Sequence, residues 1–150
     1  MFRISLLQDQ FREKARQQDE YWIDLHKNSQ ALAQGFASYL ASDDTYEDRL
    51  ENQPNVTAGV LLEDGSVETE LSSVSKQGRQ FYFHIVIYLE DVRREDPKNY
   101  LAFRLSMERG SGAKLVVRDL ATAQEFSTQR GFVAVYEHLY AKCQQVISGT

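Results

Sequence analysis

The chain has 150 residues, of which 42% are hydrophobic and 26% are charged, so it can form one compact core and does not resemble a disordered protein. Acidic residues outnumber basic ones by 22 to 17, which disfavours binding to nucleic-acid phosphates and to anionic membrane surfaces. The single cysteine excludes an internal disulfide, and no apolar run approaches the roughly 20 residues of a membrane span. We therefore expect one cytoplasmic domain over residues 1–150.

Residues 5–41 are predicted to form one long amphipathic helix, because apolar residues recur near a 3.6-residue period. The residues of this stripe are Phe11, Ala15, Trp22, Leu25, Leu32, Phe36 and Leu40. Tyr21, Trp22 and Ile23 are consecutive and cannot all face one core from a helix. Two interpretations stay open: these residues contact a partner, or they are partly buried beneath residues 1–7.

A short helix is predicted within residues 42–54, where Ser42 or Asp43 can cap it and Pro54 ends it. After this segment the hydrophobic period changes from helical to alternating. Residues 56–120 then predict five antiparallel strands joined by short turns, of which Asp64-Gly65 is a strong hairpin signal. The predicted strands cover residues 56–63, 66–75, 78–92, 100–109 and 113–120.

The turns set a strand register that places Leu71 and Met107 opposite Ile85, and Leu115 opposite Met107. In this register one sheet face is strongly apolar and the other is mixed. On the mixed face, His84 is expected beside Glu108. The same register pairs Glu108 with Lys114 and flanks Tyr88 with Glu68 and Arg104.

Residues 130–148 predict a second amphipathic helix, with Ser127 or Thr128 as its cap. Residues 121–127 are ambiguous between a loop and a short strand. Two amphipathic helices need a surface to cover, and the apolar sheet face provides one. The predicted fold is therefore α+β: a five-stranded antiparallel meander with the long N-terminal helix and the C-terminal helix packed on one face, in two layers.

Little in the sequence indicates catalysis. His84 beside Glu108 could act as a general base, but no nucleophile motif accompanies the pair, and Cys143 lies on the apolar stripe of a helix. The histidines occupy three different predicted elements, so no metal site is expected. The glycines of residues 109–114 lack the spacing of a phosphate-binding loop, and no cofactor is expected. The sequence therefore favours a function without catalysis.

Two candidate partner-binding surfaces remain. The first is the mixed sheet face, with Glu68, Tyr82, His84, Tyr88, Arg104 and Glu108; the second is the helix segment Tyr21, Trp22 and Ile23. Tyrosine and arginine are enriched in binding hot spots, although an ordinary solvated sheet face carries such residues as well. The leading hypothesis is a protein-binding module of the immunity-protein, secretion-chaperone or adaptor kind. The alternatives are a small-ligand-binding protein or enzyme that uses the sheet face around His84, and a structural homo-oligomer such as a homodimer.

Overall fold

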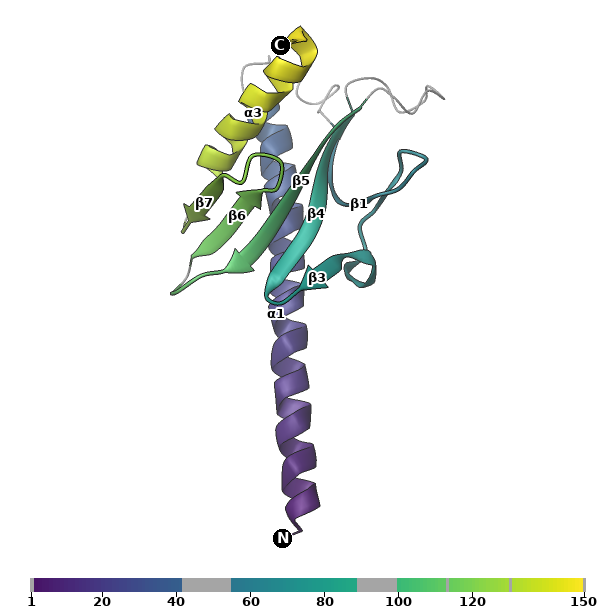
Figure 1. The fold of residues 1–150 in the computed structure, drawn as a ribbon, viewed down its shortest axis with the longest axis vertical. Coiled ribbons are helices and arrows are strands. Elements are labelled where there is room, and N and C mark those ends of the chain that lie inside the picture. Colours follow the sequence, from purple (N-terminus) through teal and green to yellow (C-terminus); the bar gives the residue numbers. More distant parts are fainter. Residues whose placement is uncertain (1, 42–54, 89–99, 113, 130, 150) are drawn as a thin grey trace.

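The computed structural model describes residues 2–41, 55–88, 100–112, 114–129 and 131–149. Within these residues, helix α1 (Arg3–Leu40) comes first along the chain and helix α3 (Val133–Ser148) comes last (Figure 1). Among the described residues, seven strands and one 3-10 turn lie between them in the sequence. The strands are β1 (Asn55–Leu61), β2 (Val67–Glu68), β3 (Ser75–Gln77), β4 (Gln80–Tyr88), β5 (Tyr100–Arg109), β6 (Leu115–Asp119) and β7 (Glu125–Thr128), and the turn is η1 (Leu71–Ser73). The predicted α+β fold is confirmed. The short helix predicted in residues 42–54 lies outside the described residues.

Helix α1 is much longer than the sheet that it covers. Its 38 residues span about 57 Å, whereas the 10 residues of β5 span about 34 Å. The buried residues of α1 accordingly lie between Leu25 and Phe36. Residues 3–20, which we call the arm, extend beyond the end of the sheet as a free helix (Figure 1). No described helix is both long enough and apolar enough to cross a membrane.

The described strands form one sheet in the order β2-β1-β4-β5-β6-β7, with β3 also paired to β4. The strands from β4 to β6 follow the predicted meander, and β7 adds a strand that includes residues 125–127 of the ambiguous segment 121–127. The prediction of one strand over residues 66–75 is wrong, because the chain there forms β2, η1 and the start of β3. Ala58 therefore lies opposite Ile85, where Leu71 was predicted.

The register along β4 and β5 also differs from the prediction. Ile85 lies opposite Phe103 instead of Met107, and Met107 lies opposite Val117 instead of Leu115. These shifts of four and two residues are even, so each side chain keeps its face while its cross-strand partner changes. The four-residue shift follows from the pairing of Tyr100 with Tyr88, where Val92 was predicted.

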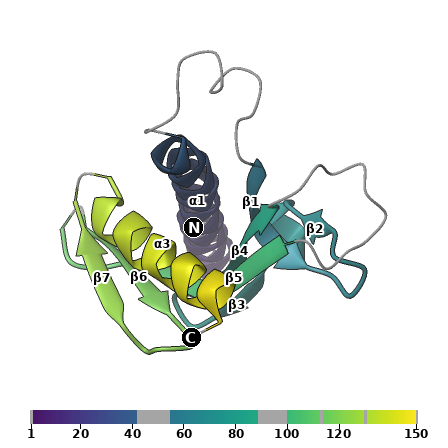
Figure 2. The same ribbon diagram turned by 90° about the horizontal axis from the view of Figure 1, so that it is seen from above.

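Both helices cover the same apolar face, and the sheet curves around α1 (Figure 2). Phe36 and Tyr136 join the helices, with ring centroids 5.7 Å apart. The predicted caps of the second helix are wrong, since Ser127 and Thr128 belong to β7 and the residue before α3 is Phe132. The largest fully buried side chains are Phe36, Phe81, Phe83, Leu25, Leu32, Ile85, Ile87, Leu105, Met107, Leu139, Val86 and Val117.

Candidate protein-binding surfaces

The sheet face away from the helices brings together Tyr82, His84 and Arg104. His84 on β4 lies directly opposite Arg104 on β5, and the Arg104 guanidinium lies 5.7 Å from the centroid of the Tyr82 ring. Glu108 on β5 lies opposite Val116 on β6. The predicted pairing of His84 with Glu108 is therefore wrong, and so is the predicted pairing of Glu108 with Lys114. The four-residue register shift explains the first difference: it moves Arg104 into the place predicted for Glu108.

Glu68 and Tyr88 lie elsewhere on this face. Tyr88 is opposite Tyr100, and its hydroxyl donates to the Gly65 carbonyl oxygen at 2.9 Å. The Glu68 carboxylate on β2 accepts a hydrogen bond from Ser73 Oγ at 2.7 Å. Tyr88 is therefore not flanked by Glu68 and Arg104 as predicted, and both side chains are held by contacts within the chain.

An open hollow forms where β1 stops pairing with β4 and β3 begins. It has a volume of about 490 Å³ and is lined by Ser75, Lys76, Gln77, Tyr82, Arg104 and Leu120. A smaller recess of about 130 Å³ adjoins it and includes His84. Arg104 is exposed, and no carboxylate of the described residues pairs with it. This hollow can therefore receive an acidic side chain, while Glu68 and Tyr88 line neither space.

His84 is half-buried, and burial lowers its pKa below the ordinary value of 6.5, with a further decrease from the nearby positive charge of Arg104. The imidazole is consequently mostly neutral at pH 7, a form that can both donate and accept a hydrogen bond. Its cross-strand neighbour is a cation, so the carboxylate that would orient a general base is not supplied from that position.

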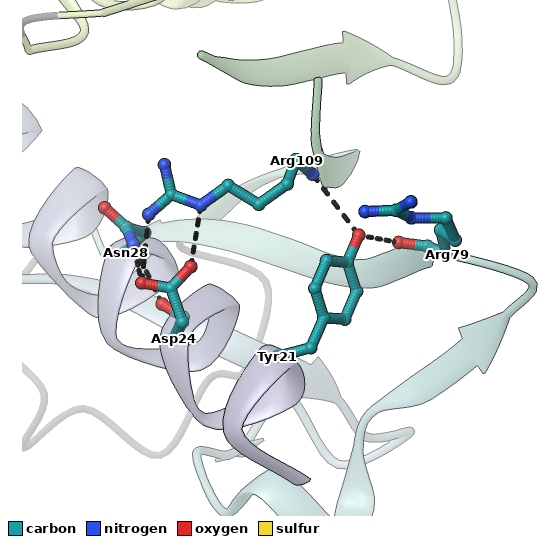
Figure 3. Close-up of polar contacts among 5 residues, drawn as sticks. All are labelled: Tyr21, Asp24, Asn28, Arg79 and Arg109. Atoms are coloured by element: carbon teal, nitrogen blue, oxygen red, sulfur yellow. Dashed lines mark hydrogen bonds and ion pairs between the residues drawn. The ribbon is translucent and has the colours of Figure 1, made fainter. Parts of the chain in front are cut away.

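The second predicted surface begins at Tyr21, which is engaged within the chain. The Tyr21 hydroxyl donates to the Arg79 carbonyl oxygen at 2.6 Å and accepts from the Arg109 backbone N–H at 3.2 Å (Figure 3). Arg109 also binds both Asp24 carboxylate oxygens, at 2.8 and 2.9 Å. These contacts tie α1 to the β3–β4 turn and to the end of β5, and thereby fix the point at which the arm leaves the sheet.

Trp22 also packs within the chain, whereas Ile23 does not. The Trp22 ring stacks on Phe81, with centroids 6.5 Å apart, and Lys76 Nζ lies 5.6 Å from its centroid. Ile23 is 45% exposed. The alternative that residues 1–7 cover this segment is wrong, because α1 begins at Arg3 and carries residues 3–7 away along the arm.

The arm carries an exposed apolar stripe that the sequence prediction did not identify as a surface. Ile4, Leu7 and Phe11 follow one another at spacings of three and four residues and are 61%, 59% and 74% exposed. The same spacing continues to Trp22 and Leu25, which pack on the sheet. The stripe is thus a continuation of the buried face of α1 beyond the region where the sheet covers it.

Charged residues on the opposite side of the arm pair with one another. Arg16 binds Glu13 at 2.5 Å and Glu20 at 3.0 Å, and Arg12 lies 3.7 Å from Asp9. Such i,i+3 and i,i+4 pairs support a helix that is exposed to water. They help to explain how the arm stays helical without tertiary packing.

A buried carboxylate that was not predicted lies between the sheet and α3. Asp119 Oδ2 lies 2.7 Å from His138 Nε2 and 2.6 Å from Lys142 Nζ. This contact leaves only 15% of the His138 side chain exposed. No group of three or more potential metal ligands occurs among the described residues. Burial raises the pKa of the Cys143 thiol to about 11, which makes it a poor nucleophile.

Comparisons of the chain with protein-family models, with curated proteins and with solved structures found no match.

Proposed function

We propose that this chain is a non-catalytic protein-binding module that acts through a specific protein partner. The observation that carries this proposal is the exposed stripe of Ile4, Leu7 and Phe11 on a helix that extends beyond its own domain. Aligned apolar side chains on a projecting helix cost free energy in water and typically mark an interaction site. The hollow beside Arg104 supplies a second surface on which the same or another partner can bind.

The stripe supports binding better than it supports a role in folding. The described part of the arm makes no packing contact with the core, whose helical members begin at Tyr21. An adaptor needs a rigid element that presents side chains away from its own domain, and a helix anchored through Tyr21 and Asp24 meets that need. The ion pairs of Arg16 with Glu13 and Glu20 help to keep the arm helical while the stripe is unoccupied.

The test is affinity capture from cells of the source organism with the full chain and with the double variant Leu7→Asp/Phe11→Asp. We expect the wild-type chain to retain at least one protein that the variant loses, because two charges prevent burial of the stripe. The matched control, Ser5→Asp/Arg12→Gln, changes the net charge by the same two units on the side of the arm away from Arg3 and Lys14, and it should retain that protein.

Urea denaturation distinguishes lost binding from lost folding. We expect the unfolding free energy of the stripe variant to stay within about 0.5 kcal/mol of the wild type, since both positions are exposed. Identical capture by the wild type and the stripe variant would contradict the proposed function.

A further inference from the structure

One edge of the stripe carries basic side chains. Arg3 and Lys14 lie on the edge next to Leu7, since they are separated from it by four and seven residues. Neither cation pairs with a carboxylate of the described residues, in contrast to Arg12 and Arg16 on the far side. One edge of the stripe therefore carries unpaired positive charge.

The stripe ends in a hollow at the base of the arm. This hollow has a volume of about 360 Å³ and is lined by Lys14, Gln17, Gln18, Tyr21, Trp22, Gly78 and Arg79. The Arg79 guanidinium lies 5.1 Å from the centroid of the Tyr21 ring, and its charge adds to that of Lys14. An elongated molecule that lies along the stripe would reach Lys14 and Arg79 at one of its ends.

A second copy of the chain fits this surface poorly. In an antiparallel helix pair the same edge of each helix meets its own copy, so Arg3 and Lys14 would face like charges. In a parallel pair both sheets would occupy the same space, because each sheet lies on the stripe side of its own α1. An anionic membrane is also disfavoured, because the chain as a whole has a net charge of -5.

We propose that the stripe binds an amphipathic helix of another protein whose apolar face is bordered by acidic side chains. This proposal rests on the proposed function and specifies the chemistry of the partner. Apolar residues of the partner helix cover Ile4, Leu7 and Phe11 while its carboxylates face Arg3 and Lys14. Because those two cations are 11 residues apart, the matching carboxylates lie about 16 Å apart, or three helical turns.

The test uses two synthetic helical peptides that share an apolar seam and differ only in their border positions, which are glutamate in one and lysine in the other. Fluorescence anisotropy with the full chain is expected to give a dissociation constant about tenfold lower for the glutamate peptide. Lys14→Glu should remove this preference. Its matched control Arg12→Glu, which makes the same change on the opposite side of the arm, should keep it.

Three results would overturn the inference. The first is equal binding of the two peptides, or binding of neither. The second is a concentration-dependent dimer in sedimentation experiments that Leu7→Asp/Phe11→Asp dissolves, which would identify a second copy as the occupant. The third is binding to vesicles that contain phosphatidylserine with no binding of the glutamate peptide. In each case, stripe-dependent capture of a cellular protein would still support the proposed function.

Discussion

At the scale of single residues, Asp119 is the most constrained charge among the described residues. Burial would raise the pKa of its carboxyl, but hydrogen bonds from Lys142, His138 and the Ala121 backbone N–H outweigh burial and lower the pKa from 3.8 to about 2. The carboxylate joins β6 to α3 at a position that otherwise belongs to the apolar face. Its hydrogen bonds to His138 and Lys142 therefore help to fix the orientation of α3 on the sheet, in addition to the apolar packing of that helix.

We predict that Asp119→Asn destabilises the chain by roughly 3 kcal/mol at pH 7, because Lys142 then loses its carboxylate partner in a mostly buried place. Urea denaturation of the variant and of Glu125→Gln measures this. Glu125 forms an exposed pair with Arg118, so its loss should cost less than about 1 kcal/mol.

The pH dependence of the same variant is a further check on this prediction. The Asp119 pKa is lower in the folded state, so the carboxylate stabilises the fold above pH 3.8 and this contribution, roughly 2 kcal/mol, is lost as the pH falls toward about 2. A difference between wild type and Asp119→Asn that stays constant from pH 5 to pH 2 would contradict the assigned role.

His84 is predicted to make the fold sensitive to mild acid. Its pKa is lower in the folded chain than the ordinary 6.5, so below that pH the unfolded state binds more protons than the folded state. Stability should consequently decrease as the pH falls below about 6.5. The titration of His84 by NMR gives the folded pKa, and His84→Gln should reduce the slope of stability against pH; an unchanged slope would show that other groups cause it.

At the scale of elements, the crossing of α1 and α3 depends on a glycine. A Cβ on Gly35 would overlap the Tyr136 hydroxyl, so the absent side chain is what allows Tyr136 to pack against α1. The Tyr136 ring is enclosed by Phe36, Tyr39 and Phe132 and has little freedom to move away. Gly35 thus permits the close approach of α3 to α1 at Tyr136.

We predict that Gly35→Ala destabilises the chain by about 1 kcal/mol, although alanine favours a helix by a similar amount, because overpacking in a core costs about 1–3 kcal/mol. A double-mutant cycle with Tyr136→Phe tests the cause, since the phenylalanine lacks the overlapping hydroxyl. The alanine should cost less in the Tyr136→Phe background, and an equal cost in both backgrounds would exclude this contact as the reason.

At the scale of the whole molecule, the difference in length between α1 and the sheet determines the shape. A sheet of about 34 Å covers little more than half of a helix of about 57 Å, and the remainder has to project. The result is a two-layer domain with a rigid arm, held at its base by Tyr21, Asp24 and Arg109 (Figure 3). This shape, with its exposed stripe, is the basis of the proposed protein-binding function.

Local patterns in the sequence were sufficient to predict both helices, the strands from β4 to β6 and the faces of their side chains. Buried side chains recur with the period of the strand or helix that carries them. Phe83 and Ile85 therefore mark the core face of β4 even when the neighbouring strands are unknown. The arm could also have been predicted, because a helix over residues 5–41 is longer than any strand predicted here. The stripe of Ile4, Leu7 and Phe11 was the signal for a surface at that place.

Cross-strand partners were decided only by the tertiary structure. The register depends on which residues pair across each turn, such as Tyr88 with Tyr100, and the apolar and polar alternation is unchanged by a shift of two or four residues. For that reason Tyr82, His84 and Arg104 could be assigned to one face from the sequence, but the pairing of His84 with Arg104 could not. The division of residues 66–75 and the burial of Asp119 beside Lys142 likewise depend on contacts between segments far apart in the chain, on which local periodicity carries no information.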